Sequence, residues 1–326
     1  MGLCVLFPVV LYWTEFATVW IQDPMVLYRS YLWAIALPGL VAVGLTEFSR
    51  GTLTKVSVLL AVVLAGLSTE RVLSLNSELT VWTDAVDKVD VRGPANAVGR
   101  YRAYLNRGAY HLGRFAPEPA MEDFKKAMAL GEPAGSAAFN LGVAQQLLKK
   151  HTDALASFAQ AEKAGYREGS LYYHRGESLY AAGQFALALD SYTTSLSLRQ
   201  SEEVLAQSRQ RRADAAMQLQ RYAQAAADFE LLLAKQPQKP GALAGLGFAR
   251  LGAGNGAGAA DSFTQLLALK PAALGFYGRA LANASLANKA AAQADIGKAV
   301  QLEPGNALYR RVQDQWKSGA VTLSIK

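Results

Sequence analysis

Three stretches of this chain repeat one another at a fixed interval: RGAYHLGRFAPEPAMEDF at 107–124, LGVAQQLLKKHTDALASF at 141–158 and RGESLYAAGQFALALDSY at 175–192. Each stretch has a glycine as its second residue, an alanine near its end and an aromatic residue as its last residue, and the glycines are 34 residues apart. A fixed period of this length is the signature of a repeat protein, in which each unit buries its apolar face only against its neighbours. The chain is therefore expected to contain a solenoid.

The pattern continues beyond the third copy. With each glycine placed at position 8 of its unit, the six units begin at or near Tyr101, Gly135, Gly169, Ala206, Pro240 and Ala273. Position 20 is alanine in all six units, position 24 is Phe, Tyr or Ile, and position 32 is proline in the last three. Small residues at 8 and 20 let two helices approach closely, the large residue at 24 fills the space between neighbouring units, and proline ends the second helix.

This pattern resembles that of tetratricopeptide repeats. The resemblance implies an all-α solenoid of about six helix-turn-helix repeats over residues 101–306. Residues 307–326 are expected to form a capping helix and a tail, because the last unit of a solenoid must be covered. Alanines and rings at the repeat positions are then structural, and replacing Ala154 or Ala188 by a large side chain should cost about 1–3 kcal/mol.

Residues 1–75 are much more apolar than the rest of the chain. Segments 31–48 and 53–75 approach the roughly 20 apolar residues that cross a bilayer, and segment 3–20, which is broken by Pro8 and carries Glu15, is a third candidate. We expect two to three transmembrane helices here, joined to the solenoid by a connecting helix within residues 76–100.

Basic residues in the short loops favour one orientation of these helices. Arg50 and Lys55 lie in the loop between the second and third segments, and basic loops stay on the cytoplasmic side. The third segment then leaves the membrane on the other side. We expect a bacterial inner-membrane protein whose solenoid is periplasmic.

Composition argues against several functional classes. The net charge of +7 is spread over 326 residues, and the densest basic group, at 209–212, favours a solvated helix face over a nucleic-acid surface. One cysteine, Cys4, cannot build a disulfide framework, and the three histidines lack the spacing of a metal site. The glycines at 252–258 lack the Gly-Lys-Ser/Thr of a phosphate loop and indicate a turn. No cofactor, metal or nucleic acid is expected, and no catalytic constellation is present.

The tetratricopeptide resemblance implies where a ligand would bind. In that fold, positions 2, 5, 9 and 12 of the first helices line the concave face. The residues selected here are aromatic with a few acids and amides, which suits a protein or peptide partner with apolar anchors: Phe139, Tyr173, Glu177, Tyr180, Gln210, Asp214, Phe248 and Tyr277. The alternative, that some of them only pack against neighbouring helices, is open for each. The family's clamp for a peptide carboxylate has lysine at 5 and asparagine at 9 of the first repeat, where this chain has Leu105 and Ala109, so that mode is not expected.

The junction between the two parts carries a second resemblance. The last apolar segment is followed by an arginine, by a helix with Leu79, Trp82 and Val86 on one stripe, and then by the repeats. This order resembles the C-terminal half of TMTC-like membrane glycosyltransferases of the GT-C class. Residues 28–32, ahead of an apolar run, are similar to that family's RxYLP motif. They depart from it in having Trp33 next, with the proline only at position 38.

This second resemblance implies an enzyme that uses a polyprenyl-phosphate sugar, with the repeats presenting protein acceptors. Arg29 would then contact the lipid phosphate, and other membrane subunits of a glycosylation machinery would be partners. The family's acidic motif and its further membrane helices would lie upstream of residue 1. For this chain alone the sequence favours a membrane-anchored scaffold that binds a protein or peptide on the extracytoplasmic side, with the C-terminal portion of a GT-C glycosyltransferase as the alternative.

Overall fold

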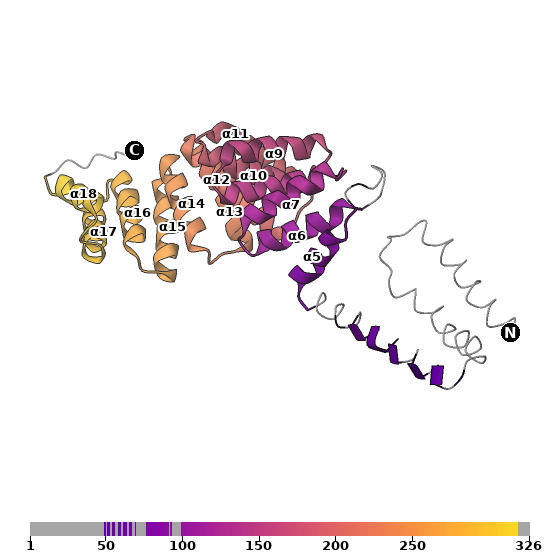
Figure 1. The fold of residues 1–326 in the computed structure, drawn as a ribbon. Coiled ribbons are helices and arrows are strands. Elements are labelled where there is room, and N and C mark those ends of the chain that lie inside the picture. The colour runs from indigo at the N-terminus through magenta and orange to yellow at the C-terminus, as the bar shows by residue number, and fades with distance from the viewer. Residues whose placement is uncertain are drawn as a thin grey trace. The chain divides into compact units, whose positions relative to one another are not determined.

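The computed structural model describes residues 76–90 and 99–318, together with Ser49, Arg92 and single positions between 51 and 69. Every regular element in these parts is helical (Figure 1). The helices are α5 (Glu78–Asp87), α6 (Tyr101–Gly113), α7 (Pro117–Ala129), α8 (Ser136–Leu147), α9 (His151–Lys163), α10 (Gly169–Ala181), α11 (Phe185–Ser197), α12 (Glu202–Gln218), α13 (Tyr222–Lys235), α14 (Pro240–Gly252), α15 (Gly256–Leu269), α16 (Ala273–Ser285), α17 (Lys289–Leu302) and α18 (Ala307–Lys317). The chain separates into two compact units between Val81 and Trp82, inside α5.

Most of the predicted membrane region lies outside the described residues, including Arg29 and Cys4. The described positions from 51 to 69 are helical, and Leu59 and Val62 among them are each 65% exposed. Within the described part of the chain, no helix combines the length and the hydropathy needed to cross a bilayer. The transmembrane helices therefore stay a prediction.

Helices α6 to α17 form antiparallel pairs that stack in chain order (Figure 1). Each helix packs on the next one along the chain, both within a pair and between pairs, and α18 packs on α17. The predicted all-α, tetratricopeptide-like solenoid is confirmed.

The residues that define the repeat form its core. The alanines at position 20 and the large side chains at position 24 are at most 1% exposed. A Cβ atom added to Gly142 would lie 2.5 Å from Cε1 of Phe158, the aromatic residue of the same unit. The aromatic residue therefore packs inside its own helix pair, which the sequence did not predict. It also reaches the next unit, as predicted: the ring centroids of Phe158 and His174 are 6.4 Å apart, and Phe263 lies against Gly278.

The turn between the helices of a pair uses left-handed backbone at position 15 in every unit. The residues with this conformation are Phe115, Lys149, Gly183, Gln220, Gly254 and Ala287. Only two of them are glycine, the residue that adopts this conformation without steric cost. In the fifth unit α14 ends at Gly252 and α15 begins at Gly256, so the glycine-rich segment is the turn that the sequence predicted.

The fourth unit begins earlier than expected. Helix α12 starts at Glu202, four residues before the predicted start at Ala206. The side chain of Ser201 caps the helix by accepting a hydrogen bond from the backbone N–H of Val204 at 3.3 Å. Glu202 and Glu203 lie in the first turn, where their negative charges interact favourably with the positive end of the helix dipole. The extra turn gives α12 a length of 17 residues.

Three helix pairs are joined by buried ion pairs that the sequence analysis did not identify. An arginine at position 7 forms two hydrogen bonds with an aspartate at position 23 in Arg107–Asp123, Arg212–Asp228 and Arg279–Asp295. The aspartate side chains are 6%, 2% and 7% exposed, respectively. The hydrogen bond to its aspartate raises the pKa of Arg107 and of Arg279, against the effect of burial. Both helices of these pairs are thus tied by charge as well as by packing.

Candidate peptide-binding face

The first helices of the pairs form one continuous layer. Each of α6, α8, α10, α12 and α14 contacts the first helix of the next pair as well as its own partner, whereas successive second helices within 101–318 make at most marginal contact. Helices that approach one another from pair to pair lie on the inner side of a curved stack. The exposed side of this layer is therefore the concave face of the solenoid.

All eight side chains predicted to line this face lie on first helices, and all are partly buried. They are Phe139 on α8; Tyr173, Glu177 and Tyr180 on α10; Gln210 and Asp214 on α12; Phe248 on α14; and Tyr277 on α16. Partial burial is compatible with both packing and binding. Their neighbours distinguish two groups among them.

The aromatic residues away from the centre of the layer pack on other rings. Phe139 stacks on Tyr166 with centroids 4.8 Å apart and an interplanar angle of 16°. Phe248 meets Phe263 edge-on at 5.0 Å, and Tyr277 contacts Tyr309 at 4.8 Å. Such ring pairs contribute about 0.5–1.5 kcal/mol beyond area burial. Phe139, Phe248 and Tyr277 therefore stabilise the stack, whatever else they contact.

The centre of the layer, at α10 and α12, has ring contacts as well, such as Tyr180 with Phe185 at 5.1 Å, and adds a polar network to them. Glu177 accepts a hydrogen bond from the hydroxyl of Tyr192 at 2.5 Å and forms an ion pair with Arg211 at 3.1 Å. Burial raises the pKa of Tyr192, and the hydrogen bond to Glu177 raises it further. The charge of Arg211 lowers the pKa of Tyr173, which burial raises more strongly. This network ties α12 to α10 across successive units.

Asp214, next to this network, is less completely paired. Its Oδ1 accepts a hydrogen bond from Nε2 of Gln210 at 3.2 Å, while the nearest guanidinium nitrogen of Arg211 lies 3.9 Å from Oδ2. The second distance is too long for a hydrogen bond. Burial raises the pKa of Asp214, although Gln210 and Arg211 both lower it. The pKa of Tyr180 is also raised, by burial and by the charge of Asp214.

A partly buried histidine joins α8 to α10. Nδ1 of His174 lies 2.8 Å from Oε1 of Gln146, and Nε2 of Gln146 donates to the His174 carbonyl at 3.0 Å. Burial lowers the pKa of His174 to about 4, so its ring is neutral at neutral pH. Its role is structural. Among the described residues, no group of three or more His, Cys, Asp and Glu side chains is arranged to hold a metal ion.

The basic group at 209–212 is not simply the solvated helix face that the sequence favoured. Arg212 pairs with Asp228, and Arg211 pairs with Glu177. The acids that neutralise them lie on neighbouring helices, so the run of basic residues by itself does not reveal the pairing.

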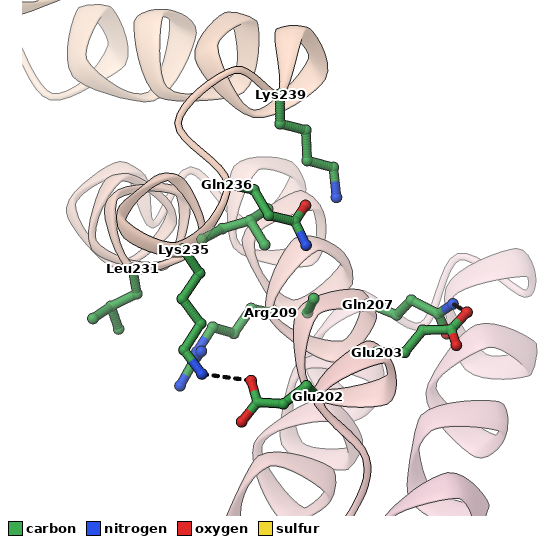
Figure 2. A pocket seen from close by; sticks show the side chains of 10 residues that line it. Glu202, Glu203, Gln207, Arg209, Leu231, Lys235, Gln236 and Lys239 are labelled. Atoms are coloured by element: carbon green, nitrogen blue, oxygen red, sulfur yellow. Dashed lines mark hydrogen bonds and ion pairs between the residues drawn. The ribbon is translucent and has the colours of Figure 1, made fainter.

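The third arginine of that group, Arg209, lines a hollow of about 470 Å³. Figure 2 shows this hollow between the first turns of α12 and the segment that leads from α13 to α14. The ammonium of Lys235 and the carboxylate of Glu202 meet there at 2.5 Å, and Lys239 extends from the connecting segment (Figure 2). Acidic and basic side chains share the lining, which leaves little net charge to select a ligand.

Two features of the sequence point to functional residues outside the eight predicted positions. An arginine at position 7 occurs together with an aspartate at position 23 in three units, and this recurrence identifies the buried ion pairs. Arg211 occupies position 6 of its unit, between the selected positions 5 and 9, and lies 34 residues after Glu177, which occupies position 9 of the preceding unit. The first helices of successive units pack side by side in a solenoid, so side chains on their shared face come close together.

Several solved structures are similar to this chain. The C-terminal part of a TPR repeat-containing protein from Cytophaga hutchinsonii is 20% identical with a TM-score of 0.53, over 64% of this chain and 82% of that one. The pilF protein of Pseudomonas aeruginosa is 16% identical (TM-score 0.51, 66% and 97%), and PilW, described as a widely conserved type IV pilus biogenesis factor, is 17% identical (TM-score 0.51, 66% and 99%). No protein-family model and no curated protein matches the chain. At these identities the similarity shows the fold alone.

Proposed function

We propose that this chain is a membrane-anchored scaffold whose solenoid binds a protein or peptide segment on its concave face. The observation that carries the proposal is the centre of the first-helix layer, where Tyr173, Tyr180 and Asp214 are only partly buried beside the network of Glu177 and Arg211. Aromatic side chains and fixed polar groups on a layer of helices suit recognition of an extended or helical peptide. Because the network fixes the side chains in advance, less ordering entropy is lost on binding.

Photo-crosslinking in cells tests the binding face. A photoreactive phenylalanine analogue placed at Tyr180 should crosslink to one specific partner. The same analogue placed at Asp190, an exposed residue on the second helix α11, serves as the matched control and should not. Equal crosslinking from both positions, or none from Tyr180, would count against recognition on the concave face.

The membrane anchor and the side of the membrane are parts of the same proposal. The apolar character of residues 1–75 supports anchoring, and so does the exposure of Leu59 and Val62 on a helical segment. Arg50 and Lys55 support a cytoplasmic loop and hence a periplasmic solenoid in a bacterial inner membrane. The chain should stay in the membrane fraction after an alkaline wash. A cysteine placed at Lys163 in a Cys4→Ser background should react with a membrane-impermeant maleimide in cells whose outer membrane has been permeabilised.

The second candidate is the C-terminal portion of a GT-C glycosyltransferase that uses a polyprenyl-phosphate sugar. It is favoured by the residues at 28–32 and by the stripe of Leu79, Trp82 and Val86, which lies on one helix, α5. Loss of protein glycosylation on deletion of the gene, restored by the wild-type chain and not by Arg29→Ala, would support it. A locus without adjacent coding sequence for further membrane helices would exclude it for this chain.

A further inference from the structure

We propose that Asp214, Gln210 and Tyr180 form a subsite for a cationic side chain, the ammonium of a lysine or the guanidinium of an arginine in the bound peptide. This inference rests on the proposed function and adds the chemistry of one partner residue to it. Gln210 and Asp214 are one turn apart on α12, and Tyr180 lies on the adjacent first helix, α10. Three observations carry the assignment: unmet acceptor atoms, a local charge imbalance and flanking aromatic rings.

Two acceptor atoms at this place have no hydrogen-bond donor among the residues that the structure describes. Oε1 of Gln210 is buried and, among the described residues, has no hydrogen-bond partner. Turning its amide over would point this oxygen at the carboxylate of Asp214, so the present orientation is the favourable one. Oδ2 of Asp214 lies 3.9 Å from the closest guanidinium nitrogen of Arg211. A ligand that brings several N–H groups can donate to Oδ2 directly, and it can donate to Oε1 as well if the Gln210 side chain turns toward it.

The local charge favours a cation over a neutral donor. Glu177 and Asp214 carry two negative charges, and Arg211, which pairs mainly with Glu177, supplies one positive charge. Lys239 is close enough for its charge to act on Asp214 but forms no ion pair with it. A cationic side chain would restore neutrality at the subsite, whereas a peptide carboxylate would face two acids. The absence of the carboxylate clamp at Leu105 and Ala109 agrees with this preference.

Tyrosine side chains flank the subsite and suit the rest of a long cationic residue. Tyr173 and Tyr180 are two turns apart on α10, and the ring of Tyr180 is held edge-on by Phe185 at 5.1 Å. Lysine and arginine lay their methylene stems on apolar surfaces and direct the charged group outward. Aromatic rings also attract cations directly. The stem would cover the tyrosine rings while the head group reaches Asp214.

Peptide selection on the full-length chain in detergent tests this inference. Short random peptides displayed on phage are selected on the wild-type chain, and a selected peptide is synthesised with its lysine or arginine and with uncharged norleucine in that place. Affinities are measured by calorimetry for the wild type, Asp214→Asn, Arg211→Gln and Asp190→Asn. Asp190→Asn is the matched control, because it removes the same charge from the exposed side of α11. Circular dichroism of each variant verifies that it is folded.

The expected result has a distinct pattern. Norleucine should weaken binding to the wild type about tenfold to a hundredfold, since hydrogen bonds to charged groups are the strong ones. It should make little difference on Asp214→Asn, while Asp190→Asn should behave as the wild type. Arg211→Gln, which removes the competing cation, should strengthen binding of the cationic peptide.

Two outcomes would overturn the inference, and they separate it from the proposed function. Selected peptides that Tyr173→Ala weakens, yet that show no cationic preference or bind Asp214→Asn equally well, would refute the cationic subsite and leave the peptide-binding face intact. Failure to select any peptide that Tyr173→Ala or Tyr180→Ala weakens would refute the binding face and the subsite together.

Discussion

Replacing Arg212 by leucine should be strongly destabilising, and a second substitution in the same helix pair should reverse most of the effect. Arg212 forms two hydrogen bonds with Asp228, whose side chain is 2% exposed. Arg212→Leu leaves a carboxylate buried without its partner. Removal of one member of a buried ion pair costs about 3–5 kcal/mol, and we expect about 3 kcal/mol here because the guanidinium is itself 20% exposed and partly hydrated.

The chain itself contains the compensating pair. The second unit has leucine at position 7 and serine at position 23, and the fifth unit has the same two residues, so Leu–Ser is compatible with this packing. Asp228→Ser alone should cost about 1–3 kcal/mol, because the partly exposed arginine loses its partner. The double variant Arg212→Leu/Asp228→Ser should lie within about 1 kcal/mol of the wild type, since replacing both charges removes the desolvation penalty together with the attraction.

Urea unfolding of the four proteins in a fixed detergent gives the coupling energy of this cycle. Hydrogen exchange of peptides from α12 and α13 localises the effect, because a solenoid opens in neighbouring units. The coupling should be about 3–6 kcal/mol, with faster exchange in both helices of the Arg212→Leu protein. If the double variant were as unstable as the sum of the two single variants, the account of the buried pair would be wrong.

Three further predictions concern packing, backbone and pH. In Gly142→Ala the new Cβ would lie 2.5 Å from the ring of Phe158, and this overpacking should cost about 1–3 kcal/mol, of which the better helix propensity of alanine offsets roughly 1 kcal/mol. In Gly241→Ala the new Cβ meets nothing within 4 Å, so this variant should be stabilised by about 0.5 kcal/mol. Thermal melting compares the two variants. Lys149→Gly should stabilise by about 1 kcal/mol in the same assay, since the residue has a φ of 58°, and an unchanged or lower midpoint would show that the turn is not strained. The pKa of His174 is about 4 in the folded chain and near 6.5 in an unfolded chain, so the neutral ring stabilises the fold fully above pH 6.5. The free energy of unfolding should fall by about 3 kcal/mol as the pH is lowered from 6.5 toward 4. Urea midpoints at these two pH values should converge in a His174→Gln protein, and a pH dependence that survives the substitution would belong to other groups.

Much of the fold was readable because the repeat is local. Gly142 and Phe158 are partners within one helix pair, separated by a single short turn, and their spacing recurs in unit after unit. The repeat period places the start of α12 at Ala206, four residues too late, because the alanine and aromatic positions carry no information about Ser201, the residue that caps the helix. A cap is a single residue with a weak signal, whereas the period is supported by several copies.

The binding face was predicted only as a set of positions. The sequence placed Tyr173, Tyr180 and Asp214 on first helices, and the structure agrees with that placement. The sequence did not indicate that Glu177 is already occupied by Arg211 and Tyr192 while Asp214 is incompletely paired. Helical periodicity gives the face on which a side chain lies and says nothing about which neighbour it contacts.

The sequence by itself determined the repeat, its length and the small and aromatic residues that let two helices meet, because those contacts depend on spacing within one hairpin. The recurrence of arginine at position 7 with aspartate at position 23 carries a signal for Arg212–Asp228, whereas only the tertiary structure decided that Arg211 pairs with Glu177. Arg211 meets Glu177 on the first helix of the preceding unit, and Arg212, the next residue, turns to Asp228 on the other helix of its own pair. Adjacent residues on a helix point about 100° apart, so these two equal charges face different neighbours, and the partner that each one finds is set by how the helices stack.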